Sequence, residues 1–264
     1  MTEKPSVHVA EARPPHAVSR LRTARLARSA KPFLARGGPK GERCPGCRLR
    51  PSHCLCALRP QAGTRAGFCL LMGGDEPLKP SNTGWLVADV VADSFAFGWA
   101  RTTVDPALLA LLADPKWQPY LVFPDASVAP ERVVHAPAAP GAGGAPGPRP
   151  LFILLDATWT QAHRMFRRSP YLDRFPVLAL QPEQASRYRL RRASRDDQLC
   201  TAEVAALCLG LAGEAPAGAL LEAWLDVFSA HYLAARNQRP ADPADAAHQR
   251  LVQAQHAFSA QTPG

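Results

Sequence analysis

The stretch LFILLDATWTQAHRMFRRSP, Leu151–Pro170, decides the fold class of this chain. Five apolar residues, Leu151 to Leu155, run directly into Asp156. A short unbroken apolar run of this kind predicts a strand that is buried on both faces. The amphipathic, arginine-studded pattern that follows predicts a helix ending near Arg168. A buried strand followed directly by a helix is typical of a parallel sheet covered by helices.

The end of this strand is also the first candidate for a functional site. In open α/β sheets, ligands bind just outside the carboxyl ends of the strands. Asp156, Thr158 and Trp159 occupy that position with a carboxylate, a hydroxyl and an indole. One to two turns further on, the helix carries three arginines: Arg164, Arg167 and Arg168. Because guanidinium groups suit phosphate, the whole arrangement predicts chemistry on a nucleotide.

The rest of the chain alternates apolar runs with helical patterns. Strands are predicted at Gly67–Met72, Phe95–Ala100, Tyr120–Phe123 and Val177–Leu180. Helices are predicted at Trp85–Ala92, Cys200–Leu211 and Ala219–Arg236, and another follows Asp105-Pro106, which supply an N-cap and a first helical proline. This alternation predicts an α/β domain over residues 63–240, with a mostly parallel sheet in three layers. A polar C-terminal tail, 241–264, is expected to follow it.

Composition and charge narrow the class of protein. The chain has 264 residues, of which 47% are hydrophobic, so it can bury a substantial core. It contains no run of about 18 apolar residues, and we expect no transmembrane helix and no membrane partner. Residues 1–65 hold 14 Lys and Arg against 3 acidic residues. Within them, residues 1–40 are basic and Pro-rich, which predicts a disordered tail. The basic residues of 1–65 and the arginines of 164–195 indicate a polyanionic partner, although a basic tail and a solvated helix face would give the same charge.

Four of the seven cysteines gather in one module, residues 41–62: Cys44, Cys47, Cys54 and Cys56. A CxxC turn presents two thiolates to one ion, and four thiolates complete a tetrahedral zinc site. Such a site has no open position, so the predicted zinc is structural. The N-terminus lacks the apolar region of a secretory signal, which predicts a reducing, cytoplasmic location and disfavours disulfides. Redox use, free thiols, or His53 in place of one cysteine remain alternatives. The surrounding arginines predict a basic knuckle for nucleic acid: Arg43, Arg48, Arg50 and Arg59.

Taken together, these motifs resemble the DTW-domain family. DATW at the strand exit is similar to the family's Asp-x-Thr-Trp signature. The other matching blocks follow in the family's order: CxxC…CxC, Asn82-Thr83-Gly84, Phe123-Pro124, Ser186-x-Tyr188-x-Leu-Arg191 and Cys200-Thr201-Ala202-Glu203. The resemblance spans about residues 44–236. The chain departs from the family at Ala157, where glycine is frequent, and after the first strand, where a frequent histidine is missing.

The resemblance implies a tRNA-uridine aminocarboxypropyltransferase. Such enzymes transfer the 3-amino-3-carboxypropyl group of S-adenosylmethionine to N3 of a tRNA uridine, position 47 in bacterial members, and release methylthioadenosine. The resemblance therefore implies tRNA as the partner, S-adenosylmethionine as a substrate and no protein partner. It also implies a SPOUT-like fold with a C-terminal trefoil knot. Methyl transfer from the same donor to RNA, and a zinc-bearing RNA-binding protein without catalysis, are the alternatives.

The expected site residues follow from this resemblance. Asp156 is expected to take the N3 proton of uracil, although a helix N-cap role is the alternative. Thr158 is expected to orient Asp156 or the uracil carbonyl, and Trp159 to stack on a base or pack beneath the site. The pocket for S-adenosylmethionine is expected to comprise Asn82, Thr83, Phe123, Pro124, Asp125, Thr201 and Glu203. Glu203 would hold the amino group or serve as a first-turn helix acid. Besides the helix arginines, RNA is expected to contact Ser186, Tyr188, Arg189, Arg191 and Arg192.

Overall fold

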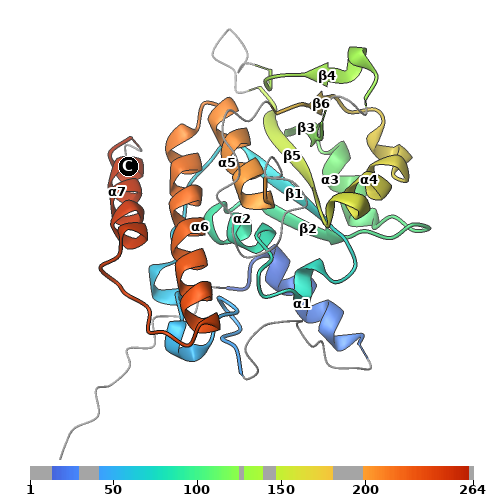
Figure 1. The fold of residues 1–264 in the computed structure, drawn as a ribbon. Coiled ribbons are helices and arrows are strands. Elements are labelled where there is room, and N and C mark those ends of the chain that lie inside the picture. The colour runs from blue at the N-terminus through green and yellow to red at the C-terminus, as the bar shows by residue number, and fades with distance from the viewer. Residues whose placement is uncertain (1–13, 30–41, 125–127, 139–146, 181–198, 262–264) are drawn as a thin grey trace, which may run out of the picture.

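The computed structural model describes residues 14–29, 42–124, 128–138, 147–180 and 199–261. Its centre is one six-stranded sheet in the order β2-β1-β5-β3-β6-β4, in which every pairing is parallel (Figure 1). The strands are β1 (Gly67–Met72), β2 (Ser94–Gly98), β3 (Trp117–Val122), β4 (Val133–Val134), β5 (Arg149–Asp156) and β6 (Val177–Leu178). The predicted α/β fold with a parallel sheet is confirmed.

The helices cover both faces of this sheet (Figure 1). They are α1 (Ala17–Ala27), α2 (Gly84–Val90), α3 (Pro106–Ala113), α4 (Trp159–Arg167), α5 (Thr201–Leu211), α6 (Ala215–Arg236) and α7 (Ala246–Gln261). The predicted cap of α3 is present, because the Asp105 side chain accepts a hydrogen bond from the amide of Ala107. Helix α6 begins four residues before the predicted Ala219, with a proline in its first turn, where a missing amide costs nothing.

Two cores result from the alternation of side chains along the strands. In β1, Phe68 and Leu70 face the core shared with α2, α5 and α6, whereas Cys69 and Leu71 face the core shared with α3 and α4. All four of these side chains are fully or almost fully buried. The central strands are therefore apolar on both faces, which explains their unbroken hydrophobic runs.

Helix α1 differs from the expectation that residues 1–40 are a disordered tail. It packs against β2, α2 and the turn at Glu76–Leu78, and its Val18 side chain is fully buried. Arg22 donates a hydrogen bond to the carbonyl of Leu78 at 2.6 Å. The sequence did not reveal this helix, because only Ala17 and Val18 are buried and no apolar stripe runs along it.

Helix α7 lies in residues 241–264, for which the sequence predicted only a polar tail. It packs on the outer side of α6, through Ala247, His248 and Leu251 (Figure 1). None of the helices in the described part of the chain has the length and apolarity needed to cross a bilayer. Residues 181–198 lie outside the described residues, so the path of the chain is not followed throughout and the trefoil knot stays a prediction.

Candidate functional site

Asp156 is the last residue of β5, and its side chain joins three separate parts of the sequence. One carboxylate oxygen, Oδ2, accepts a hydrogen bond from Nδ2 of Asn82 at 2.8 Å. The other, Oδ1, accepts one from the hydroxyl of Thr201 at 2.9 Å. Asp156 is only 3% exposed. The structure thus brings the expected catalytic acid into contact with two residues expected in the S-adenosylmethionine pocket.

Local structure explains how these side chains meet at the carboxyl edge of the sheet. Asn82 lies in the turn before α2, and its Oδ1 accepts a hydrogen bond from the amide of Trp85, which caps that helix. Thr201 is the first residue of α5. At Gly84, a Cβ atom would lie 2.3 Å from Oδ2 of Asp156. Only glycine therefore allows the first turn of α2 to approach the carboxylate this closely.

The N-cap alternative for Asp156 does not describe its position. The N-cap of α4 is Thr158, two residues further on, and that residue is exposed. Asp156 lies within the sheet, where its alignment with Met72 of β1 fixes its backbone. The expected contribution of Thr158 to catalysis stays a prediction.

The other residues expected to bind S-adenosylmethionine have mixed surroundings. Thr83 is buried beside Asn82, and Pro124 is half-buried after β3. The carboxylate of Glu203 accepts a hydrogen bond from the amide of Cys200 at 2.7 Å, so it caps α5. This contact agrees with the alternative of a helix-terminal acid, and a contact with the amino group stays a prediction. Asp125 lies outside the described residues.

An aromatic cluster lies where α4 meets the end of β3. Trp159 is 46% exposed, and its ring is parallel to that of Phe123 at a centroid distance of 6.2 Å. Phe123 in turn stacks on Phe166 at 4.3 Å. The ring of His163 is nearly perpendicular to those of Trp159 and Phe123, at centroid distances of 4.8 and 5.0 Å. His163 and Phe166 were not predicted from the sequence as neighbours of Trp159 and Phe123. The signal was present for His163, because residues four apart, such as Trp159 and His163, lie on one face of a helix.

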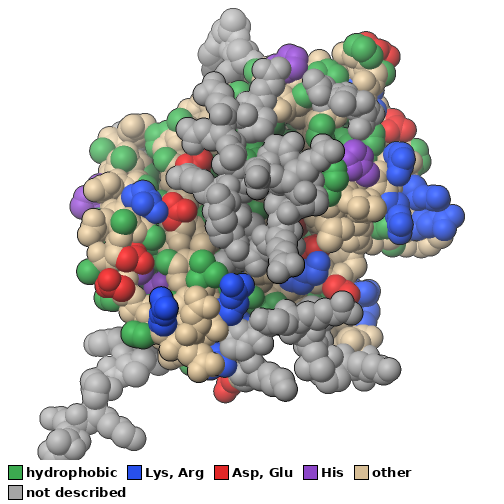
Figure 2. All heavy atoms as spheres, viewed as in Figure 1, with side chains coloured by type: hydrophobic (Ala, Val, Ile, Leu, Met, Phe, Trp, Pro, Cys, Tyr) green, Lys and Arg blue, Asp and Glu red, His purple; other side chains and the backbone are tan. Residues whose placement is uncertain are grey.

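The arginines of α4 form a basic surface beside this cluster. Arg164, Arg167 and Arg168 are exposed and line a hollow of about 340 Å³. Figure 2 shows Lys and Arg side chains gathered on the side of the molecule where Figure 1 places α4. The remaining residues expected to bind RNA lie outside the described residues: Ser186, Tyr188, Arg189, Arg191 and Arg192.

The four cysteines of the module form a compact cluster that suits zinc. Their Sγ atoms all lie within 4.8 Å of one another, and three of the pairs are 3.5, 3.6 and 3.7 Å apart. Zn–S bonds of about 2.3 Å in a tetrahedron place sulfur atoms about 3.8 Å apart. Gly46 is required here, since a Cβ atom would lie 2.7 Å from Sγ of Cys56. Cys44, Cys47, Cys54 and Cys56 therefore fit the predicted ion.

The thiols of Cys47, Cys54 and Cys56 do not ionise alike. A hydrogen bond from Cys56 lowers the pKa of Cys47 to about 5. Burial raises the pKa of Cys54 to about 11. The pKa of Cys56 is also raised, first because its proton bonds to Cys47. The cluster thus resists carrying several negative charges, and a cation would relieve that repulsion.

The predicted basic knuckle around the module is only partly correct. Arg48 is 1% exposed, and its guanidinium lies over the ring of Trp85 at 4.3 Å from the centroid. Arg59 forms an ion pair with Asp89 of α2 at 3.4 Å. These two arginines bind the module to the domain instead of facing a partner.

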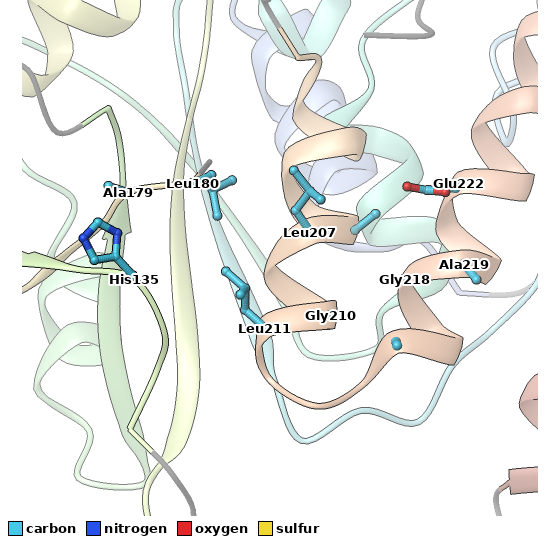
Figure 3. Close-up of a pocket in the computed structure, with 11 residues that line it drawn as sticks. His135, Ala179, Leu180, Leu207, Gly210, Leu211, Gly218, Ala219 and Glu222 are labelled. Carbon is cyan, nitrogen blue, oxygen red and sulfur yellow. The ribbon is translucent and has the colours of Figure 1, made fainter. Parts of the chain in front are cut away.

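A cavity lies apart from Asp156, between the ends of β4 and β6 and helices α5 and α6. Its volume is about 490 Å³. Figure 3 shows His135 and Ala179 on the strand side, with Leu207 and Leu211 of α5 opposite them. None of the predicted site residues that the structure describes lines this cavity.

The chain matches a known protein family over most of its length. The family model described as "DTW domain" matches residues 41–233, which include the cysteine module and all the residues of the candidate site. Helices α1 and α7 lie outside the matched range. No solved structure matches the chain.

Proposed function

Because the chain belongs to the DTW family, the family of tRNA-uridine aminocarboxypropyltransferases, we propose that it modifies a tRNA uridine. The specific reaction proposed is transfer of the 3-amino-3-carboxypropyl group of S-adenosylmethionine to N3, at position 47 as in bacterial members. One observation carries this proposal: the DATW, NTG and CTAE blocks, far apart in sequence, meet at the carboxylate of Asp156. A tRNA substrate implies a cytoplasmic location.

The reaction requires removal of a proton from a weak acid. N3 of uracil attacks carbon well only once its proton has gone, and a positioned carboxylate can accept it. Asp156 is almost completely buried, whereas Thr201 is partly exposed and already donates its hydroxyl proton to Asp156. We therefore assign Thr201 as the group that takes the N3 proton while its own proton passes to Oδ1.

Bond formation then follows without further proton transfer. The N3 lone pair forms a bond to the carbon next to the sulfonium, the C–S bond breaks, and its electron pair stays on sulfur in methylthioadenosine. Because the sulfonium already activates this carbon, the protein contributes mainly orientation of the two reactants. Asn82, Thr83, Phe123, Pro124, Asp125 and Glu203 are proposed to shape the pocket of the donor, together with Thr201.

The RNA is proposed to bind across α4. The exposed ring of Trp159 offers a face for an unpaired base, and proteins commonly bind single-stranded RNA by such stacking. The arginines of the same helix supply charge for the phosphates. The zinc in the cysteine module would stabilise the small fold that docks on α2, because a four-cysteine site leaves no position for a substrate.

Nucleoside analysis of tRNA tests this proposal in cells. A strain that lacks the gene is complemented with the wild-type chain or with Asp156→Asn. We expect aminocarboxypropyluridine only with the wild-type chain. A methylated uridine in its place would favour the alternative methyltransferase. Restoration of the modification by Asp156→Asn would rule out the assigned role of the carboxylate, and no change in any modified nucleoside would leave only RNA binding.

A further inference from the structure

Arg48 belongs to the cysteine module in sequence, but its side chain lies inside the molecule. It directly follows the ligand Cys47 and is 1% exposed. Its guanidinium lies between two aromatic rings, 4.3 Å from the centroid of Trp85 and 5.2 Å from that of Phe228. Arginine is almost never buried to this extent unless partners hold it. The burial of Arg48 therefore indicates that its side chain makes contacts that this position requires.

The backbone of Arg48 also has an unusual conformation. Its φ is +66°, and among the described residues other than glycine only Gln238 shares this left-handed region. The turn is closed by hydrogen bonds from the amide of Arg48 to the carbonyl of Cys44 and from the amide of Cys44 to that of Leu49. Glycine would adopt this conformation without steric cost. Unfavourable backbone conformations of this kind persist at functional positions, where the side chain is needed.

The contacts of Arg48 lead to the turn that precedes α2. Its Nη1 donates hydrogen bonds to the carbonyl of Asn82 at 2.9 Å and to that of Lys79 at 3.3 Å. A second connection runs from Nε1 of Trp85 to the carbonyl of Gly46 at 3.2 Å. The module thus contacts the turn and the start of α2 through Gly46 and Arg48, the two neighbours of Cys47.

Asn82 connects this turn to the candidate catalytic carboxylate. Arg48 binds the backbone carbonyl of Asn82. The side chain of Asn82 donates a hydrogen bond to Asp156 and caps α2. We propose that Arg48 is a positioning residue that couples metal binding in the cysteine module to the placement of Asn82 and Asp156. The catalytic consequence rests on the proposed function, whereas the structural coupling does not.

Hydrogen–deuterium exchange on the full chain tests the coupling. It is measured for the zinc-loaded protein and after zinc is removed with a chelator, both for the wild type and for Arg48→Met. Methionine keeps the bulk of the side chain but loses its charge and donors. In the wild type, we expect zinc removal to accelerate exchange several-fold in residues 82–90 of the turn and α2, while α3 on the other face of the sheet is unchanged.

Two comparisons identify Arg48 as the link. Arg48→Met with zinc bound should show the fast exchange at residues 82–90, and zinc removal should then add little there. The same change at Arg50, two residues further along the module, should leave residues 82–90 slow. The coupling is refuted if zinc removal accelerates residues 82–90 equally in the wild type and in Arg48→Met, or if Arg48→Met with zinc bound exchanges like the wild type.

Two further measurements keep the proposal testable if Arg48→Met does not fold. Zinc removal from the wild type alone must accelerate residues 82–90, and unchanged exchange there would overturn the proposal. Arg48→Lys keeps the charge and should retain part of the wild-type kcat, with KM for tRNA nearly constant. If the wild type transfers no aminocarboxypropyl group, the proposed function fails, yet the exchange results still decide whether Arg48 couples the two sites.

Discussion

The carboxylate of Asp156 has little freedom to reorient, because Asn82 and Thr201 each hold one of its oxygens. If this carboxylate accepts a proton, it must do so without changing its orientation. The hydroxyl of Thr201 is the more exposed of the groups that touch it. The proposed proton transfer therefore depends on the hydroxyl of Thr201 as much as on the carboxylate of Asp156.

Substitution of Thr201 tests this role. Thr201→Val keeps the shape of the side chain but removes the hydroxyl, and we expect the rate of the chemical step to fall about 100-fold, within the usual range for lost proton transfer. Thr201→Ser keeps the hydroxyl and should retain most of the rate. Single-turnover reactions with saturating S-adenosylmethionine measure both variants. Equal rates for valine and serine would contradict the assigned relay.

Gly84 offers a second test at the scale of one methyl group. In Gly84→Ala, the added Cβ would lie 2.3 Å from Oδ2 of Asp156, so the carboxylate or α2 must shift. We expect a loss of about 1–3 kcal/mol in the free energy of unfolding, as for other overpacked sites, and a loss of activity.

Gly210→Ala is the matched control for Gly84→Ala. Gly210 lies in α5, and an added Cβ would meet nothing within 4 Å. The control should be stabilised by about 0.5–1 kcal/mol, because alanine favours the helix. Denaturant unfolding of the two variants measures the difference, and equal effects would argue against a close approach at Gly84.

For single residues, the sequence suggested candidates for the site but could not show the contacts between them. Asn82 and Thr201 are 74 and 45 residues away from Asp156, so no local pattern could show that they bind its carboxylate. The sequence also could not show that the side chain of Arg48 points into the molecule. A charged residue in a cysteine-rich turn predicts an exposed side chain, and burial between Trp85 and Phe228 depends on tertiary packing.

Among the elements, those with continuous burial were predictable and those with sparse burial were not. Strand β1 has the predicted bounds, since all six of its residues are buried. Strand β4 has only two half-buried residues and was not predicted. Helices α1 and α7 each bury only two or three residues, so their sequences carry little amphipathic signal.

A histidine pair joins α7 to α6 and makes their contact sensitive to pH. The Nε2 atoms of His231 and His248 are 3.1 Å apart, and Nδ1 of His248 lies 2.8 Å from a carboxylate oxygen of Asp245. Nδ1 of His231 lies 3.1 Å from the carbonyl of His53, to which it must donate. One of the two Nε2 atoms must carry the proton of the His231–His248 hydrogen bond, and protonation of both rings would set two N–H donors against each other.

The direction of the pH effect follows from His231. Burial lowers its pKa in the folded protein below the ordinary value of 6.5. As the pH falls through 6.5, the unfolded chain takes up a proton that the folded chain resists, so the folded state loses stability. We expect faster amide exchange in α7 at about pH 5.5 than at about pH 7.5, after correction for the intrinsic rate. His231→Gln should flatten this difference, and an unchanged pH dependence in that variant would refute the explanation.

For the molecule as a whole, the proposed binding of tRNA predicts a dependence of affinity on salt concentration. The basic surface of α4 contributes three arginines that the structure shows as exposed. Replacing Arg164, Arg167 and Arg168 with alanine should weaken tRNA binding. It should also make the negative slope of the log association constant against log salt shallower by about 2–3, if each arginine contacts one phosphate. Arg250→Ala on α7 is the control, and its slope should match the wild type. A triple variant with the wild-type slope would place the RNA elsewhere.

Identification of the reaction products tests the proposed activity. The purified full chain is incubated with S-adenosylmethionine and unmodified tRNA, and the nucleosides and the donor-derived product are identified by mass spectrometry. The account predicts methylthioadenosine and aminocarboxypropyluridine in equal amounts, and neither with Asp156→Asn. Formation of S-adenosylhomocysteine with a methylated nucleoside, or no product from a folded, zinc-loaded chain, would contradict it.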